Sequence, residues 1–468
     1  MKEDVAIPMA PGKRRLFVIS IYIAIFAQMY LTFAINTIAV PLAEALNGMA
    51  LFSLIFTIGT IAQVVLTPLM GKAGELFTKS RCIVVGAVML TIQHIIVMVA
   101  PSMIVLFIAR ILGGVGSAIL FTIGVGMFAD LFPTNERAKY TGLYGSVMAI
   151  AGIVAPTLAG FIADNSNWRL VFIVSIALGF VSVVVAAISA PKEERKVSAE
   201  KASVDGWGAL FIALAVICLV GLCSFGGVYF PWASPITAAL AIATIVFAVL
   251  FGRTEKRMGT QAVIPMKVFS HRTFVLTVIS CFLVTITLMV VSTYVPAFVQ
   301  TIMQQGATVA GLAYSLPSII GFFGCTAAGV YLAKSGRFKL VSVTGITAQA
   351  VLLLALSFMG QGTSALAFLL VMTIAYGIAK SVISFVFLSV VQAKMPPELI
   401  AASTAVVMFV TTLAGALGVA IAGIIPAIIS DPAEAYAWIF RGAALLAIVS
   451  VPLMLALPKD VKPQKINS

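Results

Sequence analysis

Apolar residues run through this chain in long unbroken blocks. Residues 16–43, 82–109 and 207–252 contain no Asp, Glu, Lys or Arg. A helix needs about 20 apolar residues to cross the hydrocarbon core of a bilayer. Strands of a membrane barrel instead alternate apolar and polar side chains over about ten positions, and these blocks do not alternate. The pattern therefore predicts an all-α polytopic membrane protein.

Polar breaks and prolines divide the apolar blocks into fourteen expected transmembrane helices. Every connection between them is too short for an extramembrane domain, and the longest are residues 191–206 and 253–272. The expected helices are residues 16–42, 50–71, 82–100, 102–129, 140–163, 169–190, 207–227, 233–252, 273–298, 308–333, 340–359, 364–392, 401–427 and 437–457.

The distribution of charge predicts the orientation of these helices. The chain has 29 Lys and Arg against 16 Asp and Glu, a net charge of +13. With the N-terminus inside, all basic residues except Arg110, Arg169, Lys380 and Arg441 fall in cytoplasmic stretches. This is the positive-inside bias, so both termini are expected in the cytoplasm. The cytoplasmic loops carry the excess of positive charge, which faces the anionic lipid of the membrane surface. No nucleic-acid partner is therefore expected.

The second half of the chain repeats the first at an offset of 255 to 263 residues. "NTIAVPLA" around Pro41 matches "STYVPAFV" around Pro296, and "GKAGELFTKSR" matches "GVYLAKSGRFK". Two like six-helix halves are the build of an alternating-access carrier, with its site near the midplane. The expected domains are an N-terminal bundle 1–190, a linker 191–206, a two-helix insert 207–252, a linker 253–272, and a C-terminal bundle with tail 273–468.

Three short motifs combine glycines, prolines and charges at the ends or crossings of expected helices. The loop after the second helix, "GKAGELFTKSR", carries Gly71, Glu75, Lys79 and Arg81. The fourth helix holds "RILGGVGSA" from Arg110, and small residues such as Gly114 there let two membrane helices approach closely. The fifth holds "GIVAPTLAGF", in which Pro156 kinks the helix and Gly152 and Gly160 extend a small-residue face.

Together these motifs resemble the major facilitator superfamily, and in particular its fourteen-helix drug:proton antiporter branch. The resemblance covers nearly the whole chain and implies proton-coupled efflux of drug-like compounds, with the motif residues acting in the conformational change. The chain departs from the family pattern at several positions, and in the fifth-helix motif Ala155 and Ala159 replace two glycines. Thr78 replaces a glycine, Gly113 stands where the fourth-helix motif usually has glutamine, and Thr32 occupies an acidic position of the first helix.

The expected spans contain bases but no acid at mid-membrane depth. Every Asp and Glu falls in a loop or at a helix end, whereas His94, Arg110 and Lys380 lie within helices. His94 lies seven residues before the turn at Pro101 and Arg110 nine after it, so at 1.5 Å per residue they lie at similar depth. With Gln93 they are expected to form one polar cluster. A cavity lined by basic groups alone attracts anions.

Each of these bases also has a purely structural interpretation. His94 is either a proton acceptor or a neutral ring bonded to a helix carbonyl. Arg110 either binds an anionic group or only braces helix carbonyls. Lys380 is either a second anion contact or a neutral, lipid-facing side chain. Further polar residues of the helices either line the same pathway or join helices to one another; they are Gln28, Tyr30, Asn36, Gln63, Tyr294, Tyr314 and Tyr376.

No nucleotide loop, HExxH or GxSxG motif is present in the sequence, so we expect no enzyme, no metal and no cofactor. The expected function is gradient-driven transport of an amphipathic small molecule, proton-coupled and resembling multidrug efflux. An organic-anion carrier for bile-acid-like molecules, or a proton symporter, remains the alternative, and a channel or receptor on a carrier fold is a third. We expect a monomer in a bacterial inner membrane.

Overall fold

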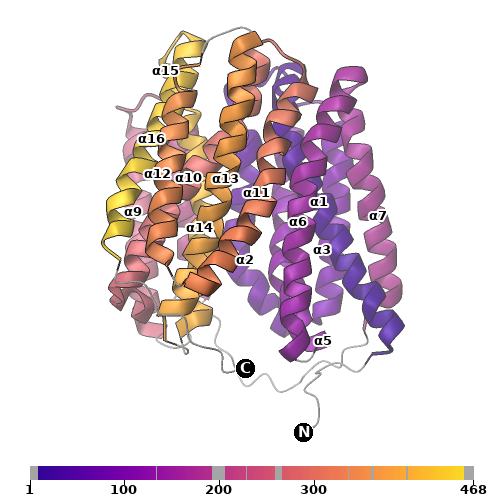
Figure 1. Cartoon of the computed structure of the whole chain (residues 1–468). Helices are drawn as coiled ribbons and strands as arrows, with labels where there is room; N and C mark the ends of the chain where they lie inside the picture. Colours follow the sequence, from indigo (N-terminus) through magenta and orange to yellow (C-terminus); the bar gives the residue numbers. More distant parts are fainter. Residues whose placement is uncertain are drawn as a thin grey trace. The chain divides into compact units, whose positions relative to one another are not determined.

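The computed structural model describes residues 9–132, 134–191, 206–227, 229–258, 266–335, 337–359, 363–396 and 399–457, and its named elements are all helices (Figure 1). Within these ranges thirteen helices are long and apolar enough to cross a membrane. A fourteenth, α13, has a shorter apolar segment at Leu366–Lys380. The all-α expectation is therefore confirmed.

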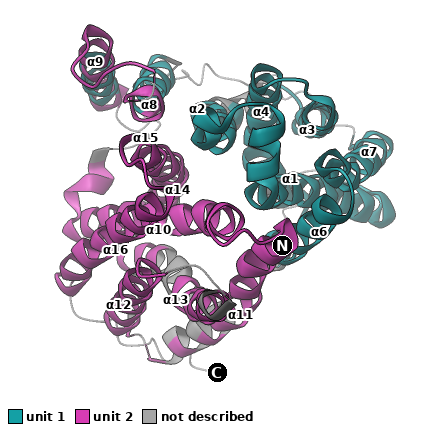
Figure 2. Cartoon of the chain, turned by 90° about the horizontal axis from the view of Figure 1, so that it is seen from above, with its two compact units in different colours: residues 1–219, 242–254 teal, residues 220–241, 255–468 magenta. Residues whose placement is uncertain are grey.

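The chain divides into two compact units, coloured separately in Figure 2: residues 1–219 with 242–254, and residues 220–241 with 255–468. The insert helices α8 (Gly206–Phe225) and α9 (Pro235–Met258) are each split between the units. Unit 1 otherwise contains α1 (Pro11–Ala45), η1 (Met49–Leu51), α2 (Phe52–Leu76), α3 (Lys79–Val99), α4 (Met103–Ile119), η2 (Leu120–Gly124), α5 (Val125–Leu131), α6 (Thr134–Asn165), η3 (Trp168–Leu170) and α7 (Val171–Ser189).

Unit 2 contains the remaining helices. They are η5 (Met266–Ser270), α10 (Arg272–Thr301), α11 (Ala307–Ser335), α12 (Phe338–Leu356), α13 (Thr363–Lys394), α14 (Ile400–Ala422), α15 (Ile425–Ile428) and α16 (Pro432–Leu455). Of the expected linkers, residues 192–205 and 259–265 lie outside the described residues.

The two units share one pattern of helix packing. In unit 1, α1 packs against α6 and α7, α3 against α4 and α7, and α2 against α4. In unit 2, α10 packs against α14 and α16, α12 against α13 and α16, and α11 against α13. These are the same five pairings once α1 is matched with α10, α2 with α11, α3 with α12, α4 with α13, α6 with α14 and α7 with α16. The repeat in the sequence thus appears as a repeat of contacts.

Several helix boundaries differ from expectation by up to about six residues, and three differences have a local reason. The helix expected at 102–129 contains a π-helical turn at Leu120–Gly124, which apolar periodicity does not reveal. The helix expected at 401–427 ends at Ala422, and α15 begins anew with Pro426 in its first turn, because proline has no N–H to continue a helix. Helix α9 continues past 252 to Met258, where Lys256 and Arg257 favour the negative end of the helix dipole.

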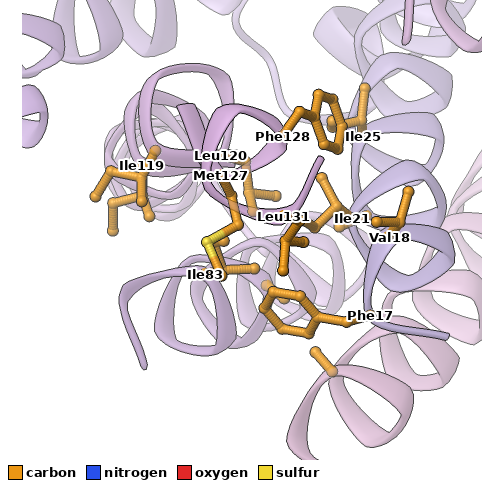
Figure 3. Packing of buried hydrophobic residues seen from close by; sticks show 14 of the residues in the cluster. Phe17, Val18, Ile21, Ile25, Ile83, Ile119, Leu120, Met127, Phe128 and Leu131 are labelled. Carbon is orange, nitrogen blue, oxygen red and sulfur yellow. The ribbon is translucent and has the colours of Figure 1, made fainter. Parts of the chain in front are cut away.

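A hydrophobic cluster holds one end of unit 1 together (Figure 3). Phe17, Ile21 and Ile25 of α1 pack with Ile83 of α3 and with the segment from Ile119 to Phe132. Aromatic side chains extend this cluster, since Tyr140 of α6 stacks on Phe132 with ring centroids 3.6 Å apart. The π-helical turn is therefore packed on one side by α1 and α3.

Candidate functional site

His94 joins three helices in the interior of unit 1. Its ring is fully buried. Nδ1 lies 3.2 Å from the backbone oxygen of Ser175 in α7, and Nε2 lies 3.3 Å from Oε1 of Gln28 in α1. The histidine is thus bonded to a helix carbonyl, which agrees with the structural interpretation of His94. It is also bonded to the side chain of Gln28.

Arg110 of α4 lies within electrostatic reach of His94 and is almost fully buried. Its Nε donates to the backbone oxygen of Ile55 in α2 at 3.2 Å. The guanidinium also fits against Gly59, where an added Cβ would lie 3.3 Å from Nε and 3.4 Å from Cζ. Glycine at position 59 therefore makes room for the charged group beside the α2 backbone. The arginine braces a carbonyl, and its guanidinium has further donors that could hold an anion.

The amide of Gln93 faces α4, whereas the adjacent His94 faces α1 and α7. The side chain is fully buried, and neither amide atom has a hydrogen-bond partner among the described residues. It occupies the volume beside Gly113, where any added Cβ would overlap the amide. Gly113 is one helical turn from Arg110, so Gln93 and Arg110 lie along the same crossing of α3, α4 and α2.

Three further polar residues expected along the pathway have different environments in unit 1. Tyr30 is buried, and its hydroxyl has no partner among the described residues. Asn36 and Gln63 are half-buried. The backbone of Gln63 lies at the close crossing of α2 and α4, 3.0 Å from a Cβ added at Gly114.

Lys380 lines a cavity inside unit 2. The cavity is small, with a volume of about 20 Å³, and lies between α10, α11 and α13. The Lys380 ammonium lies 5.9 Å from the centre of the Tyr314 ring, and both residues line the cavity. Lys380 thus forms part of a cavity wall inside unit 2. The other lining residues are Val291, Ser292, Val295, Pro296, Ala313, Pro317, Ser318, Thr373 and Tyr376.

Two prolines add backbone acceptors to this cavity. Pro296 lies inside α10 and Pro317 inside α11. Because proline has no N–H, the carbonyls four residues earlier, those of Ser292 and Ala313, lose their usual helical partner. Both of these residues line the cavity. The two prolines thus leave two carbonyls without a helical donor on residues that line the cavity.

A buried amide holds Tyr376 at the cavity wall. Gln349 of α12 donates from Nε2 to Thr287 Oγ1 at 2.5 Å and to the Tyr376 hydroxyl at 3.2 Å. Tyr376 in turn donates to the Thr287 carbonyl at 3.5 Å. Tyr294, by contrast, donates to the Val419 carbonyl of α14 at 3.2 Å and is not among the cavity-lining residues. Tyr294 therefore joins helices, the other interpretation that the sequence leaves open.

The motif residues lie at helix ends and crossings. Lys79, at the start of α3, forms a 2.5 Å salt bridge with Asp130 of α5. Arg81 is exposed, whereas Gly71 and Glu75 fall in a part of α2 whose side chains lie outside what the structure describes. Gly114 sits where α4 meets α2, because an added Cβ would be 2.5 Å from the Gly59 oxygen. Gly377 meets Pro317 in the same way at the equivalent crossing of α13 and α11.

Pro156 lies inside α6, and both Pro156 and Gly160 are buried. Helix α6 packs against α1, and Gly152 in it lies against the Phe33 ring. Among the described residues no group of three His, Cys, Asp or Glu side chains is arranged to hold a metal ion.

A model of the Major Facilitator Superfamily matches residues 21–419. This chain belongs to that superfamily. A member of the superfamily with these apolar helices is a multi-pass membrane protein.

Among relatives in the Major Facilitator Superfamily is an uncharacterized MFS-type transporter of Mycobacterium tuberculosis, 27% identical over 74% of this chain and 49% of its own length. Multidrug resistance protein 3 of Bacillus subtilis is 26% identical over 60% of this chain and 54% of its own. The chain thus spans about half the length of these two curated relatives. The multidrug transporter protein MdtP of Bacillus subtilis is 24% identical over 88% of this chain and 75% of its own length.

Solved structures of transporters share the fold of this superfamily member. A crystal structure of the peptide transporter POT in complex with sulfate has a TM-score of 0.69 at 15% identity, over 97% of this chain and 96% of that one. A crystal structure of the nucleoside transporter NupG, in a mutant form, has a TM-score of 0.67 at 14% identity, over 95% of this chain and 100% of that one.

Several residues of the two polar sites have no obvious signal in the sequence. Ser175 contributes only its backbone carbonyl, and Gly59 matters for the side chain it lacks. Gln349 was detectable in principle, because a lone amide in an apolar span needs a hydrogen-bond partner. Asp130 lies at a helix end, and nothing in the nearby sequence indicates that it pairs with Lys79, 51 residues away.

Proposed function

We propose that the chain is a secondary carrier that moves an amphipathic small molecule across the membrane by alternating access, coupled to protons and resembling multidrug efflux. The observation that carries the proposal is the superfamily match over residues 21–419. The multidrug relatives of Bacillus subtilis support an efflux-like function at 24% and 26% identity. Ionisable side chains buried in the spans support coupling to an ion, since such residues usually mark ion or substrate pathways.

The proposed architecture is two six-helix bundles, residues 1–190 and 273–468, with an insert at 207–252 and linkers at 191–206 and 253–272. The five helix pairings that recur in units 1 and 2 support it. Both termini are proposed to be cytoplasmic, in a bacterial inner membrane, and the carrier is proposed to work as a monomer. Gly71, Glu75, Lys79, Arg81, Gly114, Pro156 and Gly160 are proposed to act in the conformational change.

The transport proposal is tested with the purified chain in liposomes. A carrier gives saturable uptake and counterflow, in which unlabelled substrate on one side accelerates entry of labelled substrate from the other. Flux that rises linearly with concentration and lacks counterflow would indicate a channel and overturn the proposal. An imposed pH gradient then tests coupling: a proton-coupled carrier accumulates substrate above equilibrium, and a carrier without coupling does not.

A second candidate function, carriage of organic anions, is supported by Lys380. This residue supplies the charged group at the unit 2 cavity, whose other lining residues are uncharged. An ammonium beside hydroxyl groups and an aromatic ring suits an amphipathic molecule with an acidic head. Lys380 is proposed to contact that head, and Arg110 is proposed to bind an anionic group in unit 1.

Probes of opposite charge distinguish an organic-anion substrate from a cationic, drug-like substrate. Binding of tetraphenylphosphonium, a lipophilic cation, is compared with binding of cholate, a bile acid. The anion proposal expects cholate to bind and Lys380→Gln to weaken it at least tenfold, with Lys380→Arg retaining part of the affinity. The matched control is Lys267→Gln, an exposed lysine outside the cavity. Tighter binding of the cation, unchanged in Lys380→Gln, would exclude the anion carrier and leave cationic efflux.

A further inference from the structure

The two partners of His94 fix which ring nitrogen carries the proton in its neutral form. A backbone carbonyl can only accept a hydrogen bond, and the Ser175 oxygen lies 3.2 Å from Nδ1. Nδ1 must therefore carry a hydrogen whenever this bond is made. A neutral imidazole has only one N–H, so Nε2 is left with a lone pair. His94 is held as the Nδ1–H tautomer by helix α7.

The remaining nitrogen faces a side chain that can serve either protonation state. Gln28 has an amide with a donor end and an acceptor end. Toward the lone pair of neutral Nε2, the amide must present its NH₂ group. Toward a protonated Nε2, it must present Oε1, and Oε1 lies 3.3 Å from Nε2 in the structure. This arrangement has acceptors on both nitrogens, which is the pattern that a doubly protonated ring requires.

The charges around His94 come from few residues. The helices packed against α3 are α1, α2, α4 and α7, with the turns η2 and η3. From α4 comes Arg110, and from η3 comes Arg169, whose Nη2 donates to the Ala100 carbonyl. The apolar span of α1 contributes Tyr22 and Tyr30, with Lys13, Arg14, Arg15 and Glu44 at the ends of that helix. Residues 52–71, 120–124 and 171–189 contain no titratable side chain, and Lys72 and Glu75 near the end of α2 have side chains outside the described residues. No carboxylate of these apolar segments stands opposite the ring.

The absence of a carboxylate from these segments has a consequence for how a proton would be held. A carboxylate beside His94 would trap the proton as an ion pair, whereas two neutral acceptors stabilise the charged ring by hydrogen bonds alone. Arg110, with its fixed positive charge, opposes the protonated ring. A proton on Nε2 would therefore be held by a hydrogen bond to Gln28 Oε1, while Nδ1–H stays bonded to the Ser175 carbonyl.

We propose that His94 binds a proton on Nε2, and that Gln28 is the positioning residue that stabilises this state by turning its amide oxygen to the ring. The lone pair of Nε2 forms the new N–H bond, and the positive charge is delocalised over the imidazolium. Coupling of this proton to transport rests on the proposed function, whereas the tautomer and the role of Gln28 do not.

The tautomer is tested by ring ¹⁵N NMR of the full chain in nanodiscs. The sequence has only two histidines, so His271→Asn leaves His94 as the single signal. The expected result at high pH is a neutral ring with its proton on Nδ1, and at low pH a ring protonated on both nitrogens. A neutral ring protonated on Nε2 at high pH would overturn the inference, because the Ser175 carbonyl could not then be its acceptor.

The role of Gln28 is tested by two substitutions with opposite effects on the same NMR titration. Gln28→Leu removes the acceptor and is expected to shift the midpoint to lower pH. Gln28→Glu places a carboxylate there and is expected to shift it to higher pH by about one unit or more. The control is Thr344→Ala, whose exposed hydroxyl bonds only to carbonyls of its own helix in unit 2. Midpoints that do not move in either Gln28 variant would overturn the role of Gln28.

Transport assays separate this inference from the proposed function. If the midpoints shift as expected and the pH profile of transport shifts with them, the proton at His94 is the coupled one. If the midpoints shift and the transport profile does not, coupling through His94 is overturned while the proton site stands. If liposome flux is absent altogether, the proposed function fails, and the NMR result still decides the tautomer.

Discussion

The amide of Gln93 occupies the space that Gly113 leaves open in the neighbouring helix. In the family pattern that this chain resembles, the position of Gly113 carries a glutamine. Here a glutamine reaches the same region from α3 instead of α4, with its side chain fully buried. The amide beside the Arg110 crossing thus comes from α3 in this chain, whereas the family pattern has a glutamine on the fourth helix.

Gly113→Ala is expected to destabilise the protein, because the added Cβ would overlap the Gln93 amide. Overpacking of this kind costs about 1–3 kcal/mol. The double variant Gly113→Ala with Gln93→Ala should recover most of the loss, since the clashing group is gone. Thermal unfolding in detergent measures all three proteins. A double variant no more stable than the single one would contradict the packing relation.

The Lys79–Asp130 salt bridge is expected to contribute little to stability. Both side chains are about a quarter to a third exposed, and exposed ion pairs are worth about 0.2–1 kcal/mol. Lys79→Ala should therefore lower unfolding stability slightly, and less at high salt. Exchanging the two charges, Lys79→Asp with Asp130→Lys, should restore it. A loss well above about 1 kcal/mol, insensitive to salt, would indicate that Lys79 has a different role.

Gly377→Ala is expected to be among the most disruptive small substitutions in unit 2. The added methyl would overlap backbone atoms of Pro317, which unlike a flexible side chain cannot move aside. Helices α11 and α13 would separate, and the cavity that Pro317 lines would change shape. Gly442→Ala in α16 is the matched control, because nothing lies within 4 Å of its added Cβ. We expect a lower melting temperature for the first variant and an unchanged or higher one for the second. Equal melting temperatures would exclude a tight crossing.

Gln349→Leu is expected to weaken ligand binding more than folding. The substitution removes two hydrogen bonds, one of them to the hydroxyl of cavity-lining Tyr376. Tyr376 would keep only its 3.5 Å bond to the Thr287 carbonyl, and each lost bond is worth about 0.5–1.5 kcal/mol. Binding of cholate is compared with Thr344→Val, a change on the exposed side of the same helix. If both variants bind equally well, Gln349 does not position the tyrosine.

Sequence patterns predicted the elements well because membrane helices must be long, apolar and internally hydrogen-bonded. The ends of α3, for example, are expected at residues 82 and 100 and lie at Lys79 and Val99. The neighbourhood of His94 and Arg110 was predictable for the same reason, since 1.5 Å per residue fixes depth on two helices that share a turn.

The partners of these side chains were not predictable, because they depend on rotation about the helix axes. Depth alone did not reveal that Gln93 faces α4 while the adjacent His94 faces α1 and α7. The cavity at Lys380 also depends on three helices from distant parts of the sequence. Pro296 and Pro317 were visible as residues, but only the packing brings their helices to one cavity.

The π-helical turn at Leu120–Gly124 inserts one residue into the helix that connects Arg110 to Asp130. A residue added to an α-helix rotates everything after it by about 100°, so a helical wheel drawn through the whole segment misplaces the face on which Asp130 lies. Removing one residue within this turn would therefore restore a regular α-helix and leave its two ends facing their present neighbours. A deletion one turn earlier would instead swing Asp130 away from Lys79.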